Sequence, residues 1–357
     1  MPHVKSNTRC SARWKRNRAA ARIMQNLRLS LALSGAALTL PEDGKILVLN
    51  AGPDSDLSAL PRERVIAVQG FKPDFDALEN AGFTVLTEAE GTFSMAVVFL
   101  PRAKAEARDA IAMANAFCPD GIVVVDGQKT DGIDGMFKAC RQRADCSAAI
   151  SKSHGKIFWF PAGTSFEDWA APKDAQLAAP GFVTRPGVFS ADGIDPGSAI
   201  LAGALPPKLG EVVGDFGAGW GWLTGEILKR ETVKTVHLVE ADFAAITCAR
   251  ENITDPRAEF HWADVTRYKA LPAFDSIVMN PPFHTSRVGD PNIGKAFLSA
   301  AGRFLKPRGD LWVVANRHLP YEAHLKEVFR VVTEVSGDNK FKVFHATQPV
   351  QKTRAPS

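Results

Sequence analysis

Residues 212–221 read Val-Val-Gly-Asp-Phe-Gly-Ala-Gly-Trp-Gly: an apolar run, an acid at Asp215 and a glycine-rich turn. Glycine permits positive φ angles and lets a ligand come close to the backbone. The turn is not the dinucleotide fingerprint G-x-G-x-x-G, because Trp222 stands where the third glycine should be. The stretch therefore predicts a strand, a turn and a helix, with a bound ligand or a simple tight turn as the two interpretations.

Apolar runs alternate with helical stretches on both sides of this turn. In the C-terminal half the runs lie at 211–216, 235–239, 258–262, 274–279 and 310–315, and the helical stretches at 222–230, 241–252 and 294–304. In the N-terminal half similar runs lie at 45–50, 64–69, 84–87, 95–100 and 122–126, with a helical stretch at 103–116. This alternation is typical of βαβ units and a parallel sheet. Residues 328–335 and 340–347 flank Gly-Asp-Asn and predict an added antiparallel hairpin.

The predicted fold class is thus α/β, with two tandem Rossmann-like domains built on mostly parallel sheets. A length of 357 residues also favours two domains. The expected segments are a basic disordered tail, a first domain, a Pro/Ala/Gly-rich linker, a second domain and a short tail, at 1–26, 27–161, 162–186, 187–347 and 348–357.

Composition excludes several classes of protein. Hydrophobic residues make up 45% and charged residues 23%, which argues against disorder and collagen-like fibres. The five cysteines form no CxxC pair, so a zinc ribbon and a disulfide scaffold are not expected, and a reducing compartment is. No apolar stretch approaches the roughly 18–20 residues of a membrane span. We expect a cytoplasmic protein.

The N-terminus is strongly basic. Residues 1–41 hold eight Lys and Arg side chains and no acid, so the remaining residues sum to −4 in a chain of net charge +4. Lys5 to Arg28 could form a phosphate-contacting arm. The alternatives are a signal peptide ending in the apolar run 27–40, a disordered tail, or a true start at Met24.

Acidic residues also lie at the ends of the next two predicted strands. Glu240 lies 21 residues after Gly219, where a carboxylate can accept hydrogen bonds from both ribose hydroxyls of an adenosine ligand. Asp264 follows the run 258–262 and could accept one from an adenine amino group. Each acid alone could be a helix N-cap. Three acids that end three successive strands indicate a ligand site, because open α/β sheets bind ligands at that edge.

The sharpest motif is Asn280-Pro281-Pro282-Phe283, followed by His284. The two prolines lack N–H groups, so the carbonyls of Asn280 and Pro281 can accept hydrogen bonds from a ligand. The Asn280 side chain adds an acceptor and Phe283 a flat face, a set that suits a planar substrate with an exocyclic amino group. A proline-rich turn with a capping asparagine is the alternative.

These motifs resemble those of class I S-adenosylmethionine-dependent methyltransferases, and Asn-Pro-Pro-Phe is typical of members that methylate amino nitrogens. Further motifs narrow the resemblance to ribosomal small-subunit RNA (guanine-N2)-methyltransferases of the RsmC type, over about residues 27–347. They are Arg185-Pro-Gly-Val-Phe-Ser190, Asp192-Gly-Ile-Asp195-x-Gly-Ser198, Val314-Ala-Asn316-Arg317-His318-Leu-Pro-Tyr321 and Lys340-Phe-Lys-Val-Phe344.

The resemblance implies methyl transfer from S-adenosylmethionine to the N2 amine of a guanine. No metal-ligand spacing stands out in the sequence, so no metal site is expected. The implied cofactor-binding residues are Asp215, Gly217, Ala218, Gly219, Gly221, Glu240, Asp264, Val265 and Asn280. The implied catalytic residues are Asn280, Pro281, Pro282 and Phe283, and candidate substrate contacts are Phe189, Ser190, His284, Lys129 and Lys152. The expected partner is ribosomal RNA or the small ribosomal subunit, with no membrane, and the protein is expected to be a monomer.

In that family only the C-terminal one of two methyltransferase-like domains keeps the cofactor site. Here residues 49–54 carry one glycine where the C-terminal turn has three, and Val125-Asp126-Gly127-Gln128-Lys129 takes the fourth position in place of Asn-Pro-Pro-Phe. The N-terminal domain is then expected to support folding or RNA docking. Its candidate phosphate contacts are Lys129, Arg141, Arg143, Lys152, His154 and Lys156.

Other functions stay open at this point. Large-subunit ribosomal RNA, adenine N6 or a protein glutamine amide could be the acceptor, although the glutamine enzymes usually carry Tyr where Phe283 stands. An RNA-binding protein with two inactive domains is the non-enzymatic alternative, and the complete C-terminal motif set argues against it.

Overall fold

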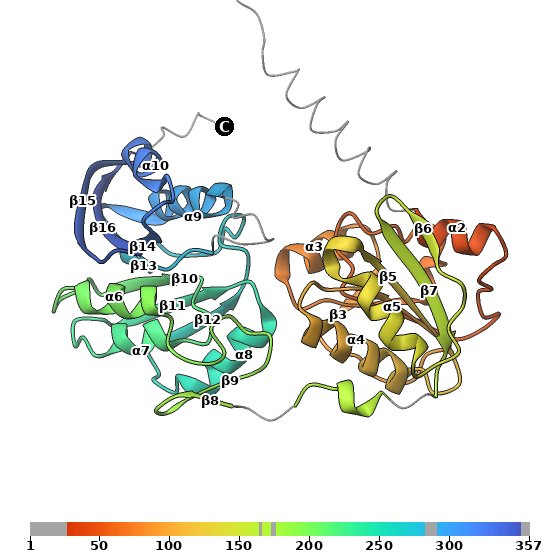
Figure 1. The fold of residues 1–357 in the computed structure, drawn as a ribbon. Helices are drawn as coiled ribbons and strands as arrows, with labels where there is room; N and C mark the ends of the chain where they lie inside the picture. The colour runs from red at the N-terminus through yellow and green to blue at the C-terminus, as the bar shows by residue number, and fades with distance from the viewer. Residues whose placement is uncertain (1–26, 164–165, 173–175, 283–290, 351–357) are drawn as a thin grey trace, which may run out of the picture. The chain divides into compact units, whose positions relative to one another are not determined.

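The computed structural model describes residues 27–163, 166–172, 176–282 and 291–350. The chain divides into two compact units, Met1–Ala171 and Pro172–Ser357. Each unit is built around one seven-stranded sheet with helices on its faces (Figure 1). No helix in the described ranges is both long and apolar enough to span a membrane.

The first sheet has five parallel strands and an antiparallel pair at one edge. In spatial order they are β3 (Thr84–Leu86), β2 (Val65–Val68), β1 (Ile46–Leu49), β4 (Met95–Phe99), β5 (Ile122–Gln128), β7 (Gly155–Pro161) and β6 (Ile150–Lys152). Helices α4 (Lys104–Phe117) and α5 (Ile133–Arg141) bury apolar side chains on one face. Helices α2 (Arg28–Ser34) and α3 (Lys72–Asn80) do so on the other face.

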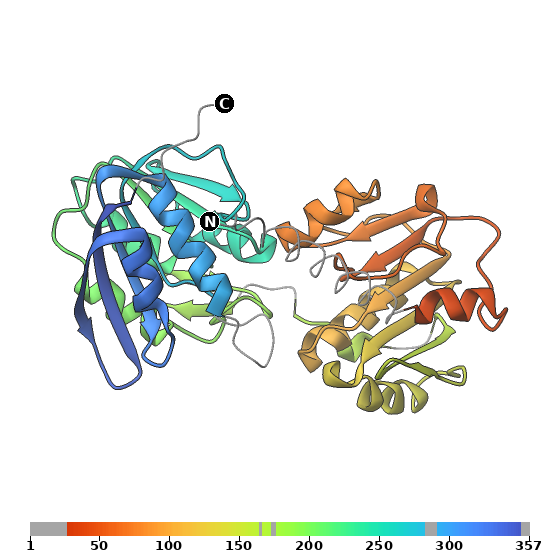
Figure 2. The same cartoon turned by 90° about the horizontal axis from the view of Figure 1, so that it is seen from above.

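The second sheet repeats this order with different strands. They are β12 (Ala258–Trp262), β11 (Thr235–Glu240), β10 (Val212–Phe216), β13 (Phe274–Met279), β14 (Leu305–Asn316), β16 (Phe341–Pro349) and β15 (Phe329–Gly337). Helices α6 (Pro196–Ala204), α7 (Trp222–Leu228) and α8 (Phe243–Asn252) pack on one face. Helices α9 (Pro291–Phe304) and α10 (Tyr321–Val328) pack on the other, as Figure 2 shows from a second side. The predicted fold class is confirmed, including the antiparallel C-terminal hairpin.

Burial on both faces explains why the strands read as apolar runs. All four residues of β1 are buried, and the successive residues Val212 and Val213 of β10 pack in different cores. A strand covered by helices on both faces needs apolar side chains at every position rather than at alternate ones.

The matching order allows the two sheets to be compared position by position. Asp215 pairs with Leu238 and Val278, and its counterpart Val48 pairs with Ala67 and Val97. By the same register Gln69 corresponds to Glu240 and Phe99 to Asn280. The assignment of residues 125–129 to the fourth position is therefore wrong, because β4 is the fourth strand and Asp126 lies in β5.

Much of the stretch expected to be a linker has regular structure. Phe166 and Trp169 are buried in the N-terminal core. Strands β8 (Gln176–Ala179) and β9 (Phe182–Thr184) form a hairpin in the second unit. Asn252 of α8 holds this hairpin, since its side chain accepts from Val183 N at 2.7 Å and donates to Val183 O at 2.8 Å.

One residue of the proposed basic arm belongs to the N-terminal core. Arg28 is 2% exposed, and its Nε donates to the equally buried Asp126 Oδ1 at 2.8 Å. Its guanidinium also donates to Lys152 O, at the turn between β6 and β7. The expectation that Arg28 contacts phosphate is wrong, because its charge is paired inside the protein. The other seven cations of the arm lie outside the described residues.

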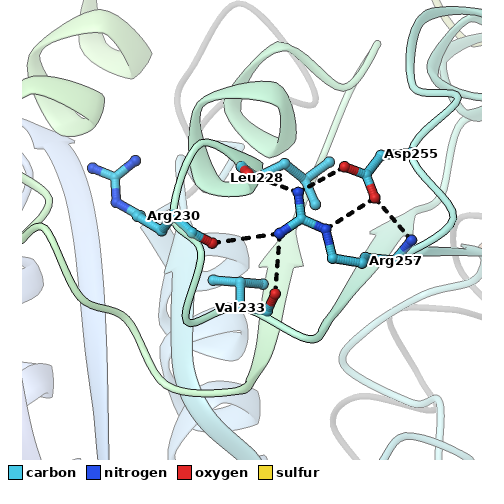
Figure 3. A network of polar contacts seen from close by, with 5 residues as sticks. All are labelled: Leu228, Arg230, Val233, Asp255 and Arg257. Atoms are coloured by element: carbon cyan, nitrogen blue, oxygen red, sulfur yellow. Dashed lines mark hydrogen bonds and ion pairs between the residues drawn. The ribbon is translucent and has the colours of Figure 1, made fainter.

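In the C-terminal sheet, a second polar network is centred on an arginine at the beginning of two neighbouring strands (Figure 3). Arg257, just before β12, donates to Leu228 O at 2.8 Å and Val233 O at 3.0 Å, in the connection from α7 to β11. Asp255 holds the same guanidinium, with contacts of 3.0 and 2.7 Å. The network fixes the entry of β11 and β12 into the sheet.

Candidate active site

The turn after β10 has the conformation that its glycines predict. Gly217, Gly219 and Gly221 have φ angles of +79°, +55° and +88°. A Cβ built on Gly219 would meet no atom within 4 Å, so this residue borders open space. A Cβ on Gly221 would lie 3.1 Å from Ile253, so this glycine also allows α7 to pack closely. The turn exposes backbone where a ligand can approach it.

Asp215 lies beneath this turn and is 1% exposed. Its Oδ2 accepts a hydrogen bond of 2.6 Å from Thr224 in the first turn of α7. Its Oδ1 is buried and finds no hydrogen-bond partner among the described residues. Burial and, to a smaller extent, the nearby charge of Glu240 raise the pKa of Asp215 to about 7, although the hydrogen bond from Thr224 lowers it. A buried acceptor without a donor is costly, so a ligand that brings a donor or a positive charge fits this position.

Glu240 supports the turn from the neighbouring strand. Its Oε2 accepts from Gly219 N at 2.9 Å, and its Oε1 accepts from Ala241 N at 2.7 Å and Asp242 N at 2.9 Å. Burial raises the pKa of Glu240, whereas these hydrogen bonds lower it. A carboxylate oxygen has two lone pairs, so Oε2 can still accept one more hydrogen bond.

Asp264 follows β12 and completes the row of acids on three adjacent parallel strands. Its Oδ1 accepts from Thr266 N at 2.9 Å and Thr266 Oγ1 at 2.6 Å, and its Oδ2 lies 3.7 Å from Arg267 Nε. The adjacent Val265 is 2% exposed and packs in the core, so only its backbone can reach a ligand.

Asn280, directly after β13, is oriented by two residues from helix α6. Its Nδ2 donates to Asp195 Oδ2 at 2.8 Å and to Ser198 Oγ at 2.9 Å. Asp195 is the N-cap of α6, and the same oxygen accepts from Ser198 N at 2.7 Å. A carboxylate only accepts, so the amide nitrogen must face Asp195 and Asn280 Oδ1 must face away. Pro281 is buried and Pro282 exposed, while Phe283 and His284 lie outside the described residues.

An open cavity joins the turn to Asn280. It brings together the predicted residues Gly217, Ala218, Gly219, Asn280, Phe189 and Ser190. Its lining also includes Asp195, Ser198, Trp220, Trp222 and Leu223. Trp220 Nε1 donates to Phe189 O at 3.1 Å and holds this loop over the turn.

The N-terminal sheet has a different arrangement at the same edge. Gln69, the counterpart of Glu240, donates to Ala51 O at 2.8 Å and accepts from Phe71 N at 2.9 Å. Its amide therefore satisfies the protein's own backbone. Lys129 and Lys152 are exposed, and Lys129 N donates to His154 O at 2.9 Å. Two other candidate phosphate contacts pair with acids of their own domain, Arg143 with Asp168 and Lys156 with Asp134.

Comparison with known proteins shows to which family the chain is related. The family model "Methyltransferase small domain" matches residues 180–345. Ribosomal RNA small subunit methyltransferase C of Hahella chejuensis is 30% identical, over 85% of this chain and 94% of the relative. This chain belongs to the ribosomal RNA small subunit methyltransferase C family.

Other members of the methyltransferase C family agree with this assignment. The protein of that name from Idiomarina loihiensis is 29% identical, over 85% of this chain and 94% of its own. A solved structure of T. thermophilus 16S rRNA N2 G1207 methyltransferase, in complex with AdoMet and guanosine, has a TM-score of 0.72 at 24% identity. It covers 87% of this chain and 90% of its own, so the fold is shared across both domains.

Proposed function

We propose that the C-terminal domain transfers a methyl group from S-adenosylmethionine to the exocyclic N2 amine of a guanine in small-subunit ribosomal RNA. The observation that carries this proposal is the orientation of Asn280. Asp195 and Ser198 take its amide hydrogens, so Oδ1 is presented as an acceptor beside the glycine-rich turn. Family membership supports the methyl donor and the class of RNA.

The residues of the turn and of the adjacent strands fit the cofactor. The glycine-rich turn provides a backbone surface, Glu240 an acceptor for one ribose hydroxyl and Asp264 an acceptor for the adenine amine. When bound, S-adenosylmethionine supplies an activated methyl group on a sulfonium. The protein then mainly has to hold the amine at attack distance, so no nucleophilic side chain is needed.

Asn280 acts on the target amine. Its Oδ1 accepts an N–H hydrogen bond and, together with the backbone carbonyls of Asn280 and Pro281, directs the nitrogen lone pair toward the methyl group. The amine becomes positively charged as its bond to carbon forms and the sulfur–carbon bond breaks, and these acceptors stabilise that charge more than the neutral amine. The amine then releases a proton to water. A guanine stacked in a duplex cannot reach this cavity, so an accessible or flipped base is required.

The direct test is methyl transfer from labelled S-adenosylmethionine to naked 16S ribosomal RNA, assembled small subunits and large subunits, followed by mapping of the label. We expect label on guanine N2 of the small-subunit RNA. Label on adenine, on large-subunit RNA or on protein would contradict the proposal. A cytoplasmic location and a monomeric state stay predictions, to be checked by fractionation and by light scattering.

A further inference from the structure

Three potential metal ligands converge at a place the proposed reaction does not use. His237 lies in β11, and Glu259 and His261 lie in β12. His237 pairs with Glu259 in the ladder, and His261 is two residues further on, so all three side chains share one face of the sheet. One ligand atom from each lies within 4.8 Å of the other two.

The distances match those between ligands of one small cation. His237 Nδ1 lies 3.0 Å from His261 Nε2 and 3.3 Å from Glu259 Oε2. Two ligands bound to tetrahedral Zn²⁺ at about 2.0–2.1 Å are separated by about 3.3 Å. Two of the three separations are thus close to this value, and the third is within 4.8 Å.

Hydrogen bonding alone leaves this cluster under-satisfied. If His237 Nδ1 is protonated, it can donate its one proton to either His261 Nε2 or the Glu259 carboxylate; if His261 Nε2 is protonated instead, His237 Nδ1 accepts and gives the carboxylate no proton. A bound cation instead takes a lone pair from each of the three groups.

We propose that His237, Glu259 and His261 form a binding site for a divalent transition metal ion, with Zn²⁺ as the preferred ion. Two imidazole nitrogens and one carboxylate oxygen are a donor set that Zn²⁺ takes in proteins, with water in the fourth position. His237 is 6% exposed and Glu259 has a side chain 56% exposed, so the site is closed on the sheet side and open to solvent beyond Glu259.

The ion would fasten the edge of the C-terminal sheet. β12 is the last strand at this edge, and β11 is its only neighbour in the described sheet. A metal bound to both strands replaces a side-chain hydrogen bond by coordination and stabilises the folded chain. The site lies apart from the cavity lining, so it does not depend on the proposed methyl transfer.

The test uses the full-length protein after treatment with a chelator. We expect calorimetry to show one equivalent of Zn²⁺ bound and the melting temperature to rise. Co²⁺ should give the visible bands of a tetrahedral site without intense sulfur charge-transfer bands, and Zn²⁺ should displace it. His261→Ala should weaken binding by more than about 100-fold, because it removes a ligand itself rather than a group that orients one.

Glu259→Gln keeps the size of an exposed side chain and should also weaken binding, which covers the case where a histidine variant fails to fold. His318→Ala removes an exposed histidine outside the cluster and should leave binding unchanged. The proposal is overturned if the wild-type protein binds no stoichiometric ion, if His261→Ala and Glu259→Gln bind normally, or if the Co²⁺ spectrum shows cysteine ligands.

Discussion

Replacing Asn280 by alanine tests whether this side chain acts on the reacting amine. The variant removes one acceptor aimed at the charge that develops on nitrogen. Loss of one such preorganised group typically lowers turnover by about 10²–10³, or about 2.7–4 kcal/mol. Asp215, Glu240 and Asp264 are unchanged, so the dissociation constant for S-adenosylmethionine should change little. A loss in turnover without a loss in affinity marks an interaction made in the transition state.

The matched variant is Asp195→Asn, which changes the group that accepts a hydrogen bond from the Asn280 amide. Asparagine is as good an N-cap as aspartate, so α6 should stay intact. The amide oxygen of the new side chain can still accept from Ser198 N and Asn280 Nδ2, but it carries no charge. A hydrogen bond to a charged group, about 1.5–3 kcal/mol, is thus replaced by a neutral one of about 0.5–1.5 kcal/mol, which weakens the preference for the productive amide orientation by about 1–1.5 kcal/mol. Turnover should therefore fall by about 5–10-fold, less than in Asn280→Ala.

The two variants together make the test decisive. Because Asp195 is proposed to act through Asn280, the double variant should be no slower than Asn280→Ala alone. Single-turnover methyl transfer gives the rates, calorimetry gives the cofactor affinity, and circular dichroism checks the fold. Near-normal turnover of Asn280→Ala would refute the acceptor role, and additive losses in the double variant would refute the link from Asp195 to Asn280.

Three further changes test other parts of the structure. Asp215→Ala should abolish S-adenosylmethionine binding while Gln69→Ala, at the counterpart of Glu240, leaves it intact; two cofactor sites per chain in calorimetry would contradict this. Burial raises the pKa of Asp215 to about 7, so its contribution to stability is complete below about pH 4 and is lost as the pH rises to 7. In urea unfolding without cofactor, Asp215→Asn should therefore lose less stability than the wild type over this range, and equal losses would argue against the raised pKa. Arg28→Met leaves buried Asp126 unpaired and should cost about 3–5 kcal/mol in urea unfolding. Adding Asp126→Leu should restore most of that stability, and a single variant as stable as the wild type would show that the pair contributes little.

The sequence was sufficient for the strands that are buried on both faces. β10 to β14 lie within or overlap the apolar runs, because each run is bounded by residues that end a strand. β6 and β7 were not foreseen, since Ser153 and His154 form their turn with positive φ and neither is a glycine. Residues 125–129 were assigned to the fourth strand position by mistake, because no recognisable motif follows β4, the actual fourth strand.

The site was predictable only where it is local in sequence. The acid and glycines of the turn lie within ten residues, so their pattern is visible directly. Asp195 and Ser198 stand in a recognisable motif, but their contact with Asn280 spans 85 and 82 residues and depends on α6 lying beside the end of β13. The cluster of His237, Glu259 and His261 likewise depends on the register of two strands.

The matching order of the two sheets has a consequence for the history of this chain. Two sheets of the same strand order in one chain are the pattern expected from duplication and fusion of a single gene. The N-terminal half has Val48, Gln69 and Phe99 where the C-terminal half has Asp215, Glu240 and Asn280. Those three positions are therefore the first to change in an attempt to build a cofactor site in the N-terminal domain.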